Sequence, residues 1–101
     1  MMNAKFQFDF IWIPSSLGGH GSAPYEGMRT TIRWQKYLNE YLQCARDIQW
    51  KVISFDPKTT QGNAIGKLTS DSPLPDDWLK DGELIELLSG FRVLAIGKIT
   101  K

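Results

Sequence analysis

The residues from Lys5 to Ile13 alternate between polar and apolar side chains, and this alternation most restricts what the chain can fold into. One face would carry aromatic side chains and the other polar ones: Phe6, Phe8, Phe10 and Trp12 against Lys5, Gln7 and Asp9. A period of two residues with bulky aromatic side chains is typical of a β-strand with one buried face. The chain is therefore expected to form a sheet that covers an aromatic core.

Five further segments carry strand-like patterns separated by turn-forming residues. They are predicted at 28–37, 47–55, 63–70, 83–88 and 91–100. Prolines, glycines and aspartates lie between most of them, and Ser89-Gly90 fits the two-residue loop of a tight hairpin. Six short strands with such connections predict an all-β antiparallel sandwich or barrel. The length of 101 residues has room for one core, so we expect a single domain over 1–101.

The segment 38–46 does not fit this strand pattern. Its apolar residues recur at helical spacing, but a segment this short without a capping residue makes a weak helix. A short helical turn and an irregular connection between strands are both open here.

The composition excludes several classes of protein. A formal net charge of +1 argues against a protein whose main task is to wrap nucleic acid. Cys44 and His20 are the single cysteine and the single histidine, so we expect no internal disulfide, no metal and no cofactor. Asp9 interrupts the apolar start of the chain, which is typical of a strand rather than a signal peptide or a membrane span. We therefore expect a cytoplasmic protein.

The glycine-rich stretch LGGHGSAPYEGMRTT, at 17–31, could be a phosphate loop, a catalytic elbow or a shaped connection. A phosphate loop needs a lysine and a hydroxyl residue ahead of a helix, whereas a strand-like run follows Gly27 here. His20 and Ser22 are close in sequence, but they belong to no nucleophile motif. The stretch is therefore predicted to be a long loop between strands, with glycines at unusual backbone angles, and the protein is not expected to be an enzyme.

Some polar and aromatic residues are candidates for binding. Arg29 and Arg33 share one face of the second strand and form a small basic stripe. Of the four tryptophans, Trp12, Trp34 and Trp50 fall at inward-facing strand positions. Trp78 lies in a loop, where it is either a lid over one end of a barrel or an exposed anchor for a partner.

Two segments resemble the C-terminal domain of elongation factor Tu. GGHGSAPYEGMRTTIRW aligns without a gap with the family pattern G-G-R-H-T-P-F-F-x-G-Y-R-P-Q-F-Y-F, and DGELIELLSGFRVLAIGKITK resembles its closing hairpin, E-G-x-x-F-x-x-R-E-G-G-R-T-V-G-A-G-V-V. The shared residues are Gly18, Gly19, Gly27, Arg29, Gly82, Gly90, Arg92 and Gly97.

This resemblance implies a six-stranded antiparallel β-barrel that in the family follows a GTPase domain and another barrel, and that helps to hold aminoacyl-tRNA and nucleotide-exchange partners. The family positions near the tRNA stem correspond to His20, Ser89 and Gly90 in this chain. None of these three is a strong phosphate ligand, and His20 stands where the family has an arginine.

The leading hypothesis is therefore a non-catalytic binding module that docks a protein partner, in translation or in a toxin–immunity type of interaction. The residues expected to contact this partner are His20, Tyr25, Glu26, Arg29, Arg33 and Trp78. The alternative is an RNA- or tRNA-binding barrel, with His20, Ser89 and Gly90 as contacts. A small-ligand-binding barrel or an enzyme is the least favoured hypothesis.

Overall fold

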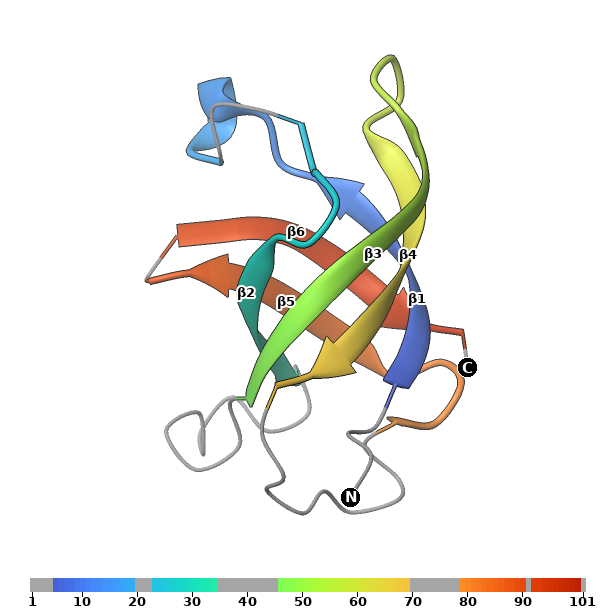
Figure 1. Cartoon of the computed structure of the whole chain (residues 1–101). Helices are drawn as coiled ribbons and strands as arrows, with labels where there is room; N and C mark the ends of the chain where they lie inside the picture. Colours follow the sequence, from blue (N-terminus) through green and yellow to red (C-terminus); the bar gives the residue numbers. More distant parts are fainter. Residues whose placement is uncertain (1–4, 20–22, 35–45, 70–78, 91, 101) are drawn as a thin grey trace.

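The computed structural model describes residues 5–19, 23–34, 46–69, 79–90 and 92–100, which form a closed antiparallel barrel (Figure 1). Its elements are β1 (Lys5–Trp12), the 3-10 turn η1 (Ser15–Leu17), β2 (Arg29–Trp34), β3 (Arg46–Asp56), β4 (Gln61–Leu68), β5 (Leu84–Ser89) and β6 (Arg92–Ile99). The strands follow the order β1-β4-β3-β2-β5-β6 around the barrel. The predicted all-β antiparallel fold is confirmed, and of the two predicted architectures, a sandwich and a barrel, the structure forms the barrel.

The aromatic face of β1 forms the centre of the core. Phe6, Phe8, Phe10 and Trp12 are all buried, as the alternation predicts. The rings of Phe8, Phe10 and Trp12 pack against Trp50 of β3, whose ring centroid lies 5.0 Å from that of Phe8 and 5.1 Å from that of Phe10. The Trp50 indole Nε1–H donates a hydrogen bond of 2.9 Å to Thr30 Oγ1, so the buried polar atom has a partner.

Glycines on β4 make room for this aromatic face. Gly66 lies opposite Phe6 and Gly62 lies opposite Phe10 in the β1–β4 ladder. A Cβ atom on either glycine would come within 2.8 Å of the Cζ atom of its phenylalanine. The large rings therefore fit inside the barrel because the neighbouring strand, β4, has glycine at these two positions.

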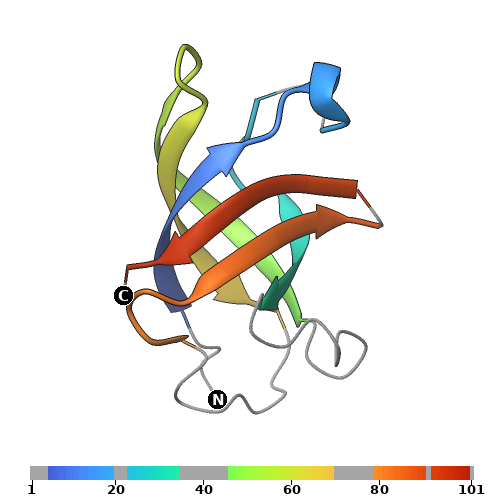
Figure 2. The same ribbon diagram turned by 180° about the vertical axis from the view of Figure 1, so that it is seen from behind.

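The hairpin between β5 and β6, which crosses the barrel in Figure 2, differs from the prediction by one residue. Ser89 still pairs with Arg92, so Ser89 belongs to β5 rather than to the loop. Gly90 has a φ of 62°, a conformation that a tight hairpin loop requires and that glycine adopts without strain. The register of the ladder shifts between Leu87 and Leu88, and both of these consecutive leucines are buried, although only Leu87 belongs to the core cluster.

The first residue of the glycine-rich stretch, Leu17, ends the short turn η1, and its last three residues begin β2. The described residues between them, 18–19 and 23–28, belong to no helix or strand. Gly18 and Gly27 have φ values of 90° and 82°, which confirms the predicted unusual backbone angles at these two positions. The predicted helical turn near 38–46 falls outside the described residues except for Arg46, which begins β3. Within the described part of the chain, no helix has the length and apolar character that crossing a membrane would need.

Candidate binding surfaces

Of the predicted contact residues in the glycine-rich loop, only some belong to the described part of the chain. His20 lies outside the described residues, as does Trp78 of the later loop. Tyr25 is an exposed large side chain. Glu26 is also exposed, but its Oε1 atom accepts a hydrogen bond of 3.1 Å from the backbone N–H of Val52 in β3. This bond ties the end of the loop to the barrel wall.

Arg29 and Arg33 do lie on the same outer face of β2, as the sequence predicts, but they have different neighbours. Arg33 forms an ion pair with Glu86 of β5, which lies directly opposite it. Arg29 is exposed and lies opposite Gln49 of β3. The charge of Arg33 is therefore balanced by Glu86 on β5, whereas Arg29 lies beside the uncharged Gln49 on β3.

The ion pair of Arg33 and Glu86 begins a row of side chains that runs across the outer face of the barrel. Ile96 of β6 lies opposite Glu86, and Ile11 of β1 lies opposite Ile96. Gln61 of β4 completes the row beside Ile11. An apolar pair thus stands on the outside of the barrel, between an ion pair and a polar amide.

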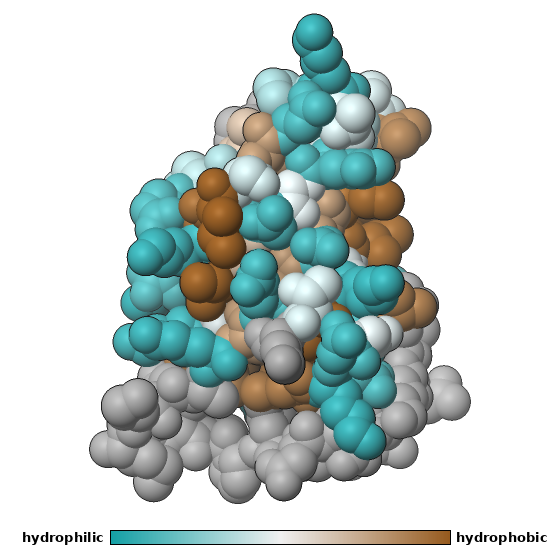
Figure 3. All heavy atoms as spheres, turned by 90° about the vertical axis from the view of Figure 1, so that its right-hand side faces the viewer, coloured by the Kyte–Doolittle hydropathy of each residue, from teal (hydrophilic) through white to brown (hydrophobic). Residues whose placement is uncertain are grey.

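This apolar pair is strongly exposed. The exposed fractions of Ile11 and Ile96 are 53% and 45%, and that of the diagonal neighbour Leu84 on β5 is 50%. We call these three residues the apolar patch. In the view of Figure 3, hydrophilic residues cover most of one side of the molecule and separate apolar groups lie between them. Neighbouring exposed apolar residues on adjacent strands, rimmed by polar groups, are a feature of interaction surfaces.

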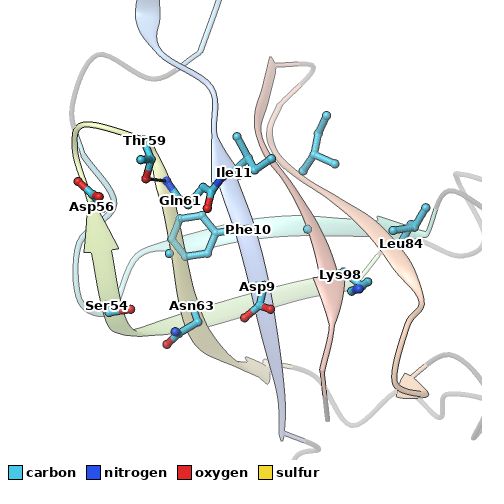
Figure 4. A pocket seen from close by; sticks show the side chains of 13 residues that line it. Asp9, Phe10, Ile11, Ser54, Asp56, Thr59, Gln61, Asn63, Leu84 and Lys98 are labelled. Carbon is cyan, nitrogen blue, oxygen red and sulfur yellow. Dashed lines mark hydrogen bonds between the residues drawn. The ribbon is translucent and has the colours of Figure 1, made fainter.

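The apolar patch borders a groove of about 700 Å³ (Figure 4). Polar side chains of the β3–β4 hairpin, such as Ser54 and Asp56, line the groove on one side of β1, and Leu84 and Lys98 lie on the other side. Asn63 lies opposite Asp9, and its Oδ1 atom is buried with no hydrogen-bond partner among the described residues. The groove therefore offers an apolar wall together with carboxylate and amide oxygen acceptors.

A second row of side chains lies on the other half of the barrel wall. Lys5 of β1 lies directly opposite Lys67 of β4, Lys67 lies opposite Gln49 of β3, and Gln49 lies opposite Arg29 of β2. Lys51 of β3 stands on the same outer face, two residues from Gln49. The sequence analysis missed these lysines because they are scattered along the chain, and only the strand order and register bring them together.

A small polar depression of about 220 Å³ brings Arg29 together with Ser89 and Gly90. Thr31, which also lines it, donates a hydrogen bond of 3.0 Å from its hydroxyl to Asp47 Oδ1. Two of the three positions that the resemblance relates to RNA contact therefore lie beside one arginine. A neighbouring carboxylate lowers the positive potential there.

The described residues form no cluster of the usual metal ligands. No three histidine, cysteine, aspartate or glutamate residues among the described ones lie close enough together to hold a metal ion. Among known proteins, no family model matches the chain and no curated sequence matches it.

Proposed function

We propose that this protein is a non-catalytic binding module that docks a protein partner on the outer face of β1, β6 and β5. The observation that carries the proposal is the direct pairing of Ile11 with Ile96, both about half exposed to solvent, with Leu84 beside them. At about 25 cal/mol for each Å² of apolar surface removed from water, covering these side chains would contribute substantially to association.

The surroundings of the apolar patch have the arrangement of a protein interface. The ion pair of Arg33 and Glu86 lies on one side, and Gln61 and Asp9 lie on the other. An apolar centre with a polar rim is the usual anatomy of such interfaces. Arg33, a contact residue in the hypothesis from sequence, is thereby assigned to the rim, with its charge held by Glu86.

The closed barrel limits how a partner can bind. Each of the six strands has a neighbour on both sides, so none offers an open edge to which a partner strand could add. Binding must use side chains and loops. A suitable partner presents apolar side chains to the patch and a hydrogen-bond donor to the acceptors that line the groove, such as Asp9, Asp56 and Gln61.

The sequence resemblance supports the same class of function. The C-terminal barrel of elongation factor Tu holds other macromolecules and carries out no chemistry itself. We propose that this chain is a barrel of that type, acting in translation or in a toxin–immunity interaction. The closed six-stranded antiparallel barrel is the fold that this assignment requires.

An RNA-binding barrel is the second candidate, and one observation favours it. Arg29, Ser89 and Gly90 line one depression, so a cation lies next to two positions that the resemblance relates to tRNA contact. A phosphate could accept hydrogen bonds from the guanidinium and from the Ser89 hydroxyl.

The test is affinity capture with the tagged protein, washed at low and at high salt, followed by binding measurements on the purified partner. The Ile11→Thr/Ile96→Thr variant removes apolar surface and keeps β-branched residues on the strands. Ile53→Thr is the matched control, because Ile53 is 51% exposed and does not line the groove.

We expect a protein that is retained at high salt, lost with Ile11→Thr/Ile96→Thr and kept by Ile53→Thr. Equal capture by all three proteins, or capture of no protein, would contradict the proposal. Recovery of RNA at low salt alone, lost with Arg29→Gln, would replace it with the second candidate.

A further inference from the structure

We propose a second interaction surface, formed by Lys5, Lys51, Lys67 and Arg29, which binds a short acidic segment of a protein. We call these four residues the basic band. It lies on the outer face of β1, β4, β3 and β2, whereas the apolar patch lies on β1, β6 and β5. The inference therefore stands independently of the function proposed above.

The first observation is that Lys5 and Lys67 are direct partners in an antiparallel ladder. The Cβ atoms of such partners lie about 5 Å apart, and like charges at this position destabilise a sheet. Folding does not need this arrangement, since almost any polar residue is tolerated on the outer face of a strand. A pair of lysines that weakens the fold is expected where an anion binds between them.

The second observation is that the basic band is not neutralised by the rest of the described structure. None of its four cations forms an ion pair with a carboxylate of a described residue. Glu26 is close by, but its Oε1 atom accepts the Val52 N–H. The band holds four of the chain's 12 lysine and arginine residues.

The third observation is a depression of about 330 Å³ among the three lysines of the band. Its floor includes the buried residue Trp50 and the partly buried Ile65. Gln49 Nε2 donates a hydrogen bond of 3.3 Å to the carbonyl of Gly27 and so fixes one side of the depression. An anion bound here would rest on the strand surface, with three lysines around it and the Glu26 carboxylate on one side.

The dimensions and borders favour a short acidic protein segment over nucleic acid. From Lys5 to Arg29 the row crosses three gaps between strands, about 14 Å, which is the length of about four extended residues. Glu26, which lines the depression, and Asp47, which lies near Arg29, both carry negative charge and would repel any anion that extends beyond the lysines. Trp50 is buried and offers no surface for base stacking, whereas Ile65 can contact an apolar side chain.

The test uses the whole protein and a fluorescent peptide of sequence Glu-Glu-Ile-Glu-Glu, with its Gln-Gln-Ile-Gln-Gln analogue and a twelve-nucleotide uridine RNA as comparison probes. Binding is measured by fluorescence anisotropy at low and at moderate salt. The variant is Lys5→Gln/Lys67→Gln. The matched control is Lys58→Gln/Lys80→Gln, which removes the same charge from exposed lysines outside the band.

We expect the acidic peptide to bind more tightly than its glutamine analogue and than the RNA. Lys5→Gln/Lys67→Gln should weaken binding about tenfold, the sum of two modest ion pairs, whereas the control should change it less than about twofold. The Lys5→Gln/Lys67→Gln variant should also unfold at an equal or higher temperature than the wild type, because the repulsion is removed.

Four results would overturn the inference. One is no binding of the acidic peptide at low salt, and another is equal weakening by the two double variants, since both would show that the band is not a specific site. The third is tighter binding of the RNA, which would make the band a nucleic-acid surface. Loss of peptide binding together with a lower unfolding temperature in Lys5→Gln/Lys67→Gln would also count against it.

Discussion

Phe6 on β1 and Gly66 on β4 face each other inside the barrel, and the phenyl ring occupies the space where a side chain at Gly66 would lie. A Cβ atom there would come within 2.8 Å of Phe6 Cζ and 3.1 Å of Ile48 Cδ1. The barrel thus accommodates the large aromatic side chains of β1 because the neighbouring strand β4 has glycine at the paired positions.

Gly66→Ala is therefore expected to destabilise the protein by about 1–3 kcal/mol, although alanine in a strand normally costs less than glycine. Urea unfolding of Gly66→Ala and of Gly66→Ala/Phe6→Leu would measure this. The double variant should recover part of the loss, because leucine is shorter than the phenyl ring. An unchanged unfolding midpoint for Gly66→Ala would show that the core is looser than described.

The hydrogen bond from Trp50 Nε1 to Thr30 Oγ1 gives a second prediction. Thr30→Val keeps the shape of the side chain but leaves a buried N–H without an acceptor, at a cost of about 1–3 kcal/mol. Thr30→Ser keeps the acceptor and should lose less. Chemical unfolding followed by tryptophan fluorescence separates the two variants. Equal stability of Thr30→Val and the wild type would be inconsistent with this hydrogen bond.

The ion pair of Arg33 and Glu86 on the rim of the apolar patch gives a third prediction. Its side chains are 25% and 14% exposed, so solvent screens the pair only in part. A double-mutant cycle with Arg33→Gln and Glu86→Gln should give a coupling energy of about 0.5–1 kcal/mol that decreases with added salt. A coupling energy near zero at low salt would mean that the pair does not hold Arg33 in place.

The sequence predicted those features that depend on neighbours along the chain. Alternation placed the aromatic face of β1 in the core, and it placed Arg29 and Arg33 on one face of β2. The hairpin loop after β5 was predicted one residue too early, because Ser89 still pairs with Arg92 and composition does not fix the last pair of a ladder. A buried residue beside its buried neighbour, as at Leu87 and Leu88, also breaks simple alternation.

The sequence could not predict features that depend on strand order and register. Nothing near Arg33 in the sequence indicates that Glu86 lies across from it, and the exposed pair of Ile11 and Ile96 follows only from the β1–β6 ladder. Ile96 lies in an apolar run that favours burial, yet it points outward because the strand alternates. The candidate surfaces are therefore properties of the closed barrel rather than of any motif.

The most direct test of protein docking at the apolar patch is site-specific photo-crosslinking in cells of the source organism. The crosslinking residue p-benzoylphenylalanine would replace Ile96 in one protein and the equally exposed Ile53 in another. We expect a discrete protein adduct from position 96 and none from position 53. The absence of an adduct at position 96, or the same adducts from both positions, would contradict the docking of a protein partner at this face.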